Sequence, residues 1–430
     1  MPPSNVSTSS SSVPFFRPSL NDAEIQEVID TLRSGWLTTG PKVKRFETQF
    51  AEAVLGRHAV SASSCTAALH LAVEALGLKP GQGVLVPTMT FAATAEVVRY
   101  QGAIPILVDC DSETLNLDLD DAARKLDQLR HGELPESIPK DTQVVGIIPV
   151  HVGGLMLDCD AIQAFAARQG LWVVEDAAHA FPSAWRRSPS EPWQRCGEGT
   201  ADVSCFSFYA NKTITTDEGG MAVTNDAELA ARIQRMSLHG LTEDAWNSYS
   251  ESGSGDYKIG APGFKYNLTD IAASIGIHQL ARSEEMRKER ESIAKRYLEQ
   301  LSNIPEIELP PDDPDRIHSW HLFPLRLRLE RLSVDRNAFI QALKQAHVGC
   351  SVRWRPLHLH PYYQETFGWR TKDLPVASTV CERLISLPIF PGMCDGEIDH
   401  VIRTVRMLCA VFGLSSVNRP IARCEARVSA

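Results

Sequence analysis

Short apolar stretches alternate with longer amphipathic ones through the first half of the 430-residue chain. The short stretches are rich in valine and isoleucine and apolar on both faces, which is typical of strands in a sheet covered on both sides. They are 83–87, 104–111, 144–152 and 171–177, and 203–210 and 221–225 add further strands. Helices fit between them, for example 66–76, closed by Gly77, and 160–169, closed by Gly170. The pattern predicts an α/β fold with a mostly parallel sheet.

A helical pattern precedes the first of these strands. Four apolar residues recur there at helical spacing, namely Ile25, Val28, Ile29 and Leu32. Asn21 and Glu24, three residues apart, have the spacing of a capping box. We therefore expect an amphipathic helix over 22–33, which Gly35 ends.

The pattern changes beyond residue 270. Residues 270–300 predict one or two long helices, and a smaller C-terminal α/β domain follows. Its expected elements are a strand at 321–329 and helices at 335–346 and 397–411, with a proline-rich loop at 309–314. The expected domains are a large one over 14–280 and a small one over 281–415, with a disordered Ser-rich segment at 1–13 and a tail at 416–430.

Composition and charge narrow the function classes. The apolar and charged fractions, 43% and 22%, are ordinary for a soluble globular protein. A net charge of −10 argues against nucleic acid or an anionic membrane as the main partner. The ten cysteines are scattered without metal-ligand spacing, which favours reduced thiols, no metal site and a cytoplasmic location. The N-terminus lacks the pattern of a secretory signal, and no apolar run reaches the ~20 residues of a membrane span.

The segment FSFYANKTITTDEGG, at 206–220, carries the strongest candidate for chemistry. Its one lysine, Lys212, follows an apolar aromatic run and precedes hydroxyl residues and two glycines. A desolvated lysine loses its proton readily and can form a Schiff base. The alternative is a surface lysine in a loop, which the preceding apolar strand disfavours. As a Schiff-base lysine, Lys212 would carry pyridoxal 5′-phosphate (PLP), and the chain would be an enzyme.

Two further positions suggest the ends of a cofactor site. Asp176 ends the predicted strand 171–177, and ligand sites of open α/β sheets gather at the C-terminal ends of strands. A buried carboxylate there needs a partner such as a protonated pyridine nitrogen, although an Asp that caps the next helix fits the motif equally well. Thr66 begins a helix, where backbone N–H groups favour a phosphate, and Ser207 could face the same pocket.

Two aromatic side chains are weaker candidates. Phe91 follows a predicted strand and could stack on a cofactor ring, but such a phenylalanine is more often part of the core. His179 lies three residues after Asp176 and could lie beside the cofactor, but a histidine there is usually structural.

Together these motifs resemble the DegT/DnrJ/EryC1/StrS family of PLP-dependent sugar aminotransferases, over roughly residues 14–412. Eight segments in the same order carry the resemblance: SGWLTTGPKVKRFE (34–47), SSCTAALHLA (63–72), PTMTFAAT (87–94), PVHVGG (149–154), VEDAAHA (174–180), FSFYANKTITTDEGG (206–220), GFKYNLTDI (263–271) and RPLHLHPYY (355–363). The resemblance implies PLP fold type I, as in aspartate aminotransferase, with a large domain and a smaller C-terminal α/β domain.

The resemblance also implies roles for single residues. Lys212 matches the lysine that forms the Schiff base and moves protons, and Asp176 matches the acid that pairs with the pyridine nitrogen. The other cofactor positions are the backbone of Cys65, the hydroxyls of Thr66 and Ser207 at the phosphate, Phe91 on the ring and His179 beside it.

Further positions imply a second subunit and a substrate. Asn267 resembles the asparagine that reaches the phosphate in the other subunit, which implies an obligate two-fold homodimer with shared active sites. The expected substrate contacts are Trp36 and Thr39 in the 34–41 loop, and His358.

The resemblance implies transfer of an amino group from glutamate to the keto sugar of a nucleotide sugar. LHG (238–240), followed by DAW (244–246) and GFKYNLTDI (263–271), is similar to the branch that makes UDP-4-amino-4-deoxy-L-arabinose, which favours C4 of a UDP-4-keto sugar. One alternative is an aminotransferase on another nucleotide sugar, of the GDP-perosamine or dTDP-3-amino type. Two others are a PLP-dependent sugar dehydratase, disfavoured because such members carry histidine where this chain has Lys212, and a catalytically idle regulator on the same fold.

Overall fold

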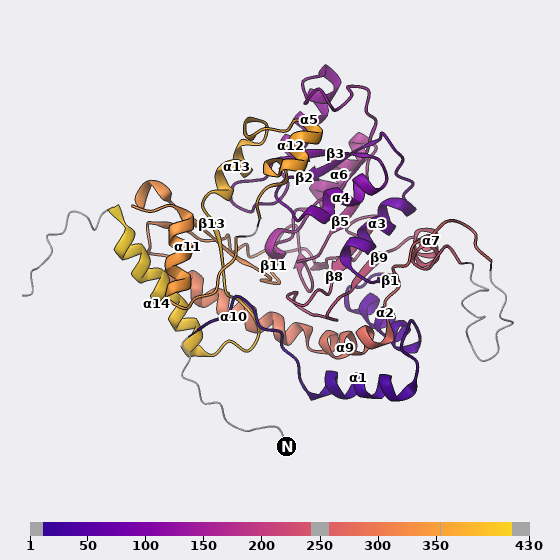
Figure 1. Ribbon diagram of the computed structural model, residues 1–430, viewed down its shortest axis with the longest axis horizontal. Helices are drawn as coiled ribbons and strands as arrows, with labels where there is room; N and C mark the ends of the chain where they lie inside the picture. Colours follow the sequence, from indigo (N-terminus) through magenta and orange to yellow (C-terminus); the bar gives the residue numbers. More distant parts are fainter. Residues whose placement is uncertain (1–11, 242–257, 353, 415–430) are drawn as a thin grey trace, which may run out of the picture.

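The computed structural model describes residues 12–241, 258–352 and 354–414 (Figure 1). The predicted tail at 416–430 and the DAW segment lie outside the described residues, as does most of the predicted disordered segment at 1–13. Val13, the last residue of that segment, is buried and pairs with Val348.

A seven-stranded sheet forms the centre of the molecule (Figure 1). Its strands, in spatial order, are β1 (His58–Ala62), β9 (Gly220–Thr224), β8 (Val203–Ser207), β5 (Trp172–Asp176), β4 (Val144–Ile147), β2 (Gly83–Pro87) and β3 (Ile104–Val108). Neighbouring strands are parallel except at β9, which is antiparallel to β1 and to β8. The predicted α/β fold with a mostly parallel sheet is confirmed.

Helices pack on both faces of this sheet. They are α2 (Pro41–Ala53), α3 (Cys65–Ala75), α4 (Ala92–Tyr100), α5 (Leu119–His131), α6 (Cys159–Gln169), α7 (Ala227–Ser237) and α9 (Asp270–Ala281). Strand β9 is buried on both faces. Ala222 belongs to the core under α3, whereas Met221 and Val223 belong to the core that α2 and α9 cover. Strands buried on both faces cannot show an alternating pattern.

A second, antiparallel sheet lies beside the first. It consists of β10 (Ile307–Glu308), β12 (Phe323–Leu327) and β13 (Leu384–Leu387), and α10 (Ser283–Leu301), α11 (Arg336–Gln345) and α14 (Asp395–Phe412) share its core. The expected strand and helices of this part are present, and the 270–300 region is two helices.

The two parts interlock through short elements. A third sheet joins β11 (Arg316–Ile317) to β6 (Ala184–Trp185) and β7 (Gln194–Arg195). Helix α12 (Pro361–Phe367) packs into the core of the central sheet, although α13 (Pro375–Cys381) leads back to β13. The domain boundary near residue 280 therefore stays a prediction.

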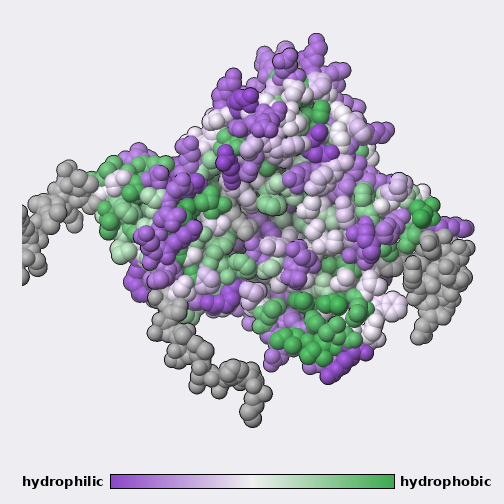
Figure 2. Space-filling model, viewed as in Figure 1, coloured by the Kyte–Doolittle hydropathy of each residue, from purple (hydrophilic) through white to green (hydrophobic). Residues whose placement is uncertain are grey.

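The first helix, α1 (Asp22–Ser34), forms where the apolar spacing predicted it, and the capping box of Asn21 and Glu24 is present. Its orientation is unexpected. Ile25 and Leu32 are each 54% exposed, whereas Glu24 and Thr31 are buried against the rest of the chain. Figure 2 shows the resulting apolar patch over α1 at the bottom of the view.

Among the described helices, none combines the length and the apolar character that crossing a membrane requires.

Candidate functional site

A cavity of about 550 Å³ opens where β5 and β8 end, beside the first turn of α3. Seven residues predicted from the sequence to hold a cofactor line it: Cys65, Thr66, Phe91, Asp176, His179, Ser207 and Lys212. They come from segments that are far apart in the sequence and that meet because parallel strands end at the same edge of the sheet.

Asp176 is the buried acid of this cavity. It is the last residue of β5 and is 5% exposed. Its Oδ1 accepts a hydrogen bond from the backbone N–H of Ala178 at 3.1 Å, and its Oδ2 accepts one from the hydroxyl of Thr94 at 2.7 Å. Burial raises the pKa of Asp176, although the hydrogen bonds and the nearby charge of Lys212 oppose this rise. A cation in the cavity would relieve the desolvation of this carboxylate.

Lys212 lies in the turn that follows β8, where its backbone N–H donates to the carbonyl of Tyr209 at 2.9 Å. The side chain is half-buried and lines the same cavity as Asp176. Its positive charge acts to lower the pKa of both Asp176 and the Cys65 thiol, so the amine lies close to both groups; burial nevertheless raises both pKa values. The cavity therefore combines a lysine amine with a buried carboxylate.

The opposite side of the cavity suits an anion. Helix α3 begins at Cys65, and Ser64 caps it by accepting a hydrogen bond from the backbone N–H of Ala67 at 3.0 Å. The first N–H groups of a helix have no acceptor within it, and the helix dipole favours negative charge there. The hydroxyls of Thr66 and Ser207 line the same cavity.

A glycine lets two backbones meet at this point. A Cβ at Gly220 would lie 2.4 Å from the carbonyl carbon and oxygen of Ser64 and 2.5 Å from the nitrogen of Cys65. Because these neighbours are backbone atoms, they cannot rotate away as a side chain could. The second glycine of the TTDEGG sequence thus allows β9 to approach the first turn of α3.

Aromatic rings form further walls. Phe91 is the N-cap residue of α4 and is 66% exposed as a residue, which leaves an aromatic side chain available for stacking. His179 is buried, accepts a hydrogen bond from the backbone N–H of Gly153 at 3.3 Å, and stacks on Trp354 with ring centroids 5.0 Å apart. Trp354 was not expected from the sequence, because no local pattern brings it to a cavity formed mainly by the central sheet.

These residues fit PLP by their chemistry. The buried carboxylate of Asp176 suits a protonated ring nitrogen, the first turn of α3 with its hydroxyls suits a phosphate, and Lys212 suits an aldehyde. The exposed ring of Phe91 suits a flat aromatic cofactor.

Three other predicted residues lie at a second cavity of about 500 Å³, namely Trp36, Thr39 and Asn267. The side-chain amide of Asn267 donates to the Thr39 hydroxyl at 2.7 Å, and the Trp36 indole donates to the Thr39 carbonyl at 3.1 Å. Lys265 also contacts the Asn267 amide oxygen. Within one chain, this group does not line the cavity that contains Lys212.

His358 lines neither cavity. It is fully buried, with Nδ1 2.8 Å from the Thr88 hydroxyl and Nε2 2.7 Å from the Ser378 hydroxyl. Burial lowers the pKa of His358 to about 4, so the ring is neutral at physiological pH. In this structure both ring nitrogens contact hydroxyls within the protein, and the substrate contact expected of His358 stays a prediction.

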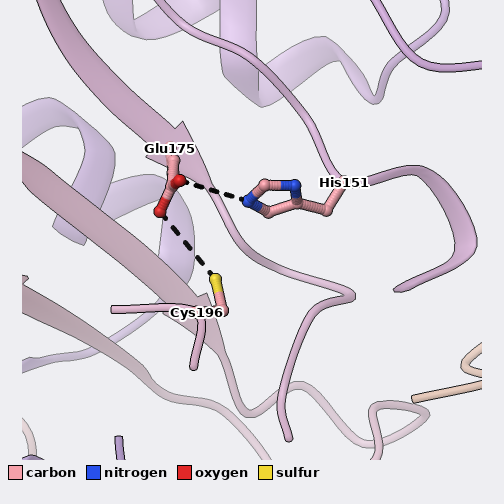
Figure 3. A group of neighbouring side chains, drawn as sticks. All are labelled: His151, Glu175 and Cys196. Atoms are coloured by element: carbon pink, nitrogen blue, oxygen red, sulfur yellow. Dashed lines mark hydrogen bonds and ion pairs between the residues drawn. The ribbon is translucent and has the colours of Figure 1, made fainter. Parts of the chain in front are cut away.

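A buried polar group surrounds Glu175, the residue that precedes Asp176 in β5. Figure 3 shows His151 and Cys196 pointing at opposite oxygens of the Glu175 carboxylate. His151 Nε2 lies 3.5 Å from one oxygen, and Cys196 Sγ lies 3.9 Å from the other. Hydroxyls of Thr200 and Ser204 donate to Glu175 at 2.7 and 2.6 Å. Burial acts to raise the pKa of Glu175, but His151 and the hydroxyls hold it below its usual value. Although the three side chains are close enough to surround an ion, these protein contacts already satisfy the Glu175 carboxylate.

The chain is similar to known proteins over nearly its whole length. The sequence profile of the DegT/DnrJ/EryC1/StrS aminotransferase family matches residues 18–406. The spore coat polysaccharide biosynthesis protein SpsC of Bacillus subtilis is 42% identical over 395 residues, which cover 92% of this chain and 96% of SpsC.

Solved structures also match this chain over nearly its whole length. Spr1654 of Streptococcus pneumoniae, assigned as a sugar aminotransferase and solved in PLP and PMP forms, matches in its PLP form with a TM-score of 0.80 at 31% identity, over 93% of this chain and 99% of that one. The aminotransferase TlmJ of Streptoalloteichus hindustanus matches with a TM-score of 0.80 at 30% identity, over 93% and 99% of the two chains.

Proposed function

Because the chain belongs to the DegT/DnrJ/EryC1/StrS aminotransferase family and is a PLP-dependent sugar aminotransferase of fold type I, we propose that it aminates a nucleotide sugar. The amino donor in this proposal is glutamate, and the acceptor is the C4 keto group of a UDP-4-keto sugar. The observation that carries the proposal is the meeting of Lys212, Asp176 and the first turn of α3 at one cavity.

We assign the cofactor's contacts from this cavity. Asp176 would pair with the ring nitrogen, and Phe91 would cover one face of the ring. The phosphate would bind at the first turn of α3, with the backbone at Cys65 and the hydroxyls of Thr66 and Ser207 as donors. His179, held by Trp354, would lie beside the cofactor.

PLP, when bound, acts as an electron sink that stabilises negative charge on the carbon next to the transferred nitrogen. Lys212 holds the cofactor at rest and serves as the general base in each half of the reaction. In the first half it takes the proton from Cα of glutamate. In the second half it would take a proton from the C4′ carbon of the cofactor and supply the proton that C4 of the sugar gains. Asp176 keeps its negative charge throughout and so holds the ring nitrogen protonated.

We further propose that the enzyme is a homodimer with shared active sites. Asn267, Trp36 and Thr39 would complete the site of the other subunit, because in their own chain they line a different cavity. The apolar face of α1, with Ile25 and Leu32 exposed, supports a subunit contact next to the 34–41 loop that contains Trp36 and Thr39. In such a dimer the Asn267 amide would reach the partner's phosphate, while Trp36 and Thr39 would contact the substrate.

The nature of the sugar is inferred from short sequence segments and from one relative. The LHG segment and the GFKYNLTDI segment favour the UDP-4-keto sugar, and the similarity to SpsC supports a product that enters a polysaccharide. Lipid A or other glycan modification is compatible with the same chemistry, as are GDP-perosamine-type and dTDP-3-amino-type substrates. We place the reaction in the cytoplasm.

The deciding experiment is mass spectrometry of the products formed from a panel of keto nucleotide sugars with ¹⁵N-labelled glutamate. We expect a labelled amino sugar from the UDP-4-keto substrate. Label in a GDP- or dTDP-linked product instead would redirect the assignment within the family. A dehydrated product without label would show a sugar dehydratase and overturn the proposal.

A further inference from the structure

The carboxylate of Asp176 is held by a side chain to which no role has been assigned above. The Thr94 hydroxyl lies 2.7 Å from Asp176 Oδ2, and Thr94 is fully buried in the first turn of α4. Thr90, which lines the cavity and is 2% exposed, places its own hydroxyl 2.6 Å from that of Thr94. The three polar groups form a continuous buried row that ends at the cofactor acid.

The direction of the hydrogen bonds in this row follows from the charge. An ionised carboxylate only accepts hydrogen bonds, so the single hydroxyl hydrogen of Thr94 points at Asp176. The Thr94 oxygen is then free to accept a hydrogen bond. Of its two other contacts, the Thr90 hydroxyl at 2.6 Å can donate, whereas the Phe91 carbonyl at 3.3 Å cannot. The row therefore runs from Thr90 to Thr94 to Asp176, and each hydroxyl donates toward the acid.

The row fixes the orientation of the carboxylate. Oδ1 accepts from the backbone N–H of Ala178 and Oδ2 accepts from Thr94. Rotation of the carboxylate plane would break both hydrogen bonds inside a buried site, where unmade hydrogen bonds are costly. Each oxygen keeps a lone pair for one more donor.

The same turn of helix also positions the ring platform. Phe91 is the N-cap of α4, and both the backbone N–H and the hydroxyl oxygen of Thr94 lie 3.3 Å from the Phe91 carbonyl. The first turn of α4 therefore ties the exposed ring of Phe91 to the orientation of Asp176.

We propose that Thr94 is a positioning residue, which with Thr90 behind it holds Asp176 as an oriented, ionised acceptor for the cofactor's ring nitrogen. This inference rests on the proposed function. Burial raises the pKa of Asp176, and the Thr94 hydrogen bond is the strongest influence that opposes this rise. Without it, the acid would more readily take up its own proton and would no longer attract the protonated ring.

A ring nitrogen can be removed from the ligand, which makes the proposal testable by binding alone. The apoprotein is titrated with PLP and with its 1-deaza analogue, in which a C–H group replaces the ring nitrogen. The variants are Thr94→Val, which keeps the shape and removes the hydroxyl, Thr94→Ser, which restores it, and Thr90→Val. Thr404→Val, at a buried position of α14, controls for loss of a buried threonine hydroxyl.

For Thr94→Val we expect the dissociation constant of PLP to rise about tenfold, the size expected for a hydrogen bond to a charged group, and that of the deaza analogue to change less than about twofold. The Thr94→Ser protein should retain its affinity for PLP. The Thr90→Val protein should lose a smaller part of this affinity than Thr94→Val, and the Thr404→Val protein should lose none of it.

Equal losses for both ligands would show that Thr94 only supports the fold, and unchanged PLP affinity would show that it has no role; either result overturns the inference. If Thr94→Val does not fold, Thr90→Val decides by the same comparison. Failure of the wild-type apoprotein to bind PLP would instead contradict the proposed function itself.

Discussion

Glu24 of α1 accepts a hydrogen bond from the guanidinium of Arg282 at 2.6 Å, so the first helix is attached to α9 through its polar side. Gln279 donates to the same carboxylate oxygen at 2.7 Å. The apolar side of α1, which would ordinarily face the core of a single chain, is left on the surface, and this is the arrangement that a subunit interface requires.

The exposed face of α1 gives the first prediction. Replacing both Ile25 and Leu32 with Asp should turn the proposed dimer into monomers, because two charges would have to be desolvated in an apolar contact. Light scattering after size-exclusion chromatography measures this change. Val411→Asp, at a 63% exposed apolar position on α14, is the matched control and should leave the mass unchanged. A monomeric wild-type protein, or a dimer that survives both charges, would contradict the role of this face.

Shared active sites give a second prediction. Lys212→Ala and Asn267→Ala proteins should each have little activity, but mixing them under conditions of subunit exchange should restore activity. A hybrid dimer has one site with both residues intact, and hybrids form about half of the dimers after random exchange, so about a quarter of the wild-type activity is expected. If mixing gives only the sum of the two separate activities, Asn267 does not act across the interface.

The third prediction concerns Lys212. The Lys212→Ala protein should lose the visible absorbance of the lysine-bound cofactor, and its turnover should fall by several orders of magnitude. Both effects are expected because the Schiff base and the proton carrier are the same amine. Absorbance spectra and product formation are measured together. Lys344→Ala, at an exposed position of α11, should retain both. A Lys212→Ala protein that keeps full turnover would exclude this lysine as the proton carrier.

Asp176 gives a prediction about pH and stability. Burial raises its pKa above the ordinary value of 3.8, so the folded apoprotein holds this proton more tightly than the unfolded chain does. The resulting stability is fully present below the ordinary pKa and is lost as the pH rises through the raised pKa. At neutral pH, Asp176→Asn should therefore raise the melting temperature of the apoprotein, by about 1–3 °C, while it removes turnover.

The measurement for Asp176 is a pair of thermal melts at several pH values. The difference between Asp176→Asn and wild type should shrink as the pH falls toward the ordinary pKa, where the wild-type carboxyl is protonated as well. A lower melting temperature of the variant at neutral pH would show that the ionised carboxylate stabilises the apoprotein, contrary to the effect of burial.

The glycine that meets the first turn of α3 gives the last prediction. Gly220→Ala should destabilise the protein by about 1–3 kcal/mol, because the new Cβ would overlap backbone atoms of Ser64 and Cys65. The same displacement should weaken the binding of PLP. The comparison is Gly396→Ala, whose Cβ would meet only the Cys394 sulfur at 3.9 Å. Thermal melts and cofactor titration check both effects, and a fully stable Gly220→Ala protein would contradict the close approach.

Local sequence determined most of the elements and much of the first cavity. The stretch 83–87 is a strand with those bounds, and the capping box at Asn21 begins a helix as its spacing predicts. Asp176 was expected at a ligand site because it ends an apolar strand, and the resemblance to the family's motifs placed Lys212 at the same cofactor.

Tertiary structure alone decided how these elements meet. Periodicity showed that α1 has an apolar face but could not show that the face points away from the core, since that depends on Glu24 reaching α9. The histidine at 358 had a plausible position in its motif, yet folding buries it between two hydroxyls. Thr94 and Asp176 lie 82 positions apart, so no local pattern could join them. Local chemistry therefore specified the elements and the reactive groups, whereas long-range packing selected which groups touch, because it depends on the whole chain at once.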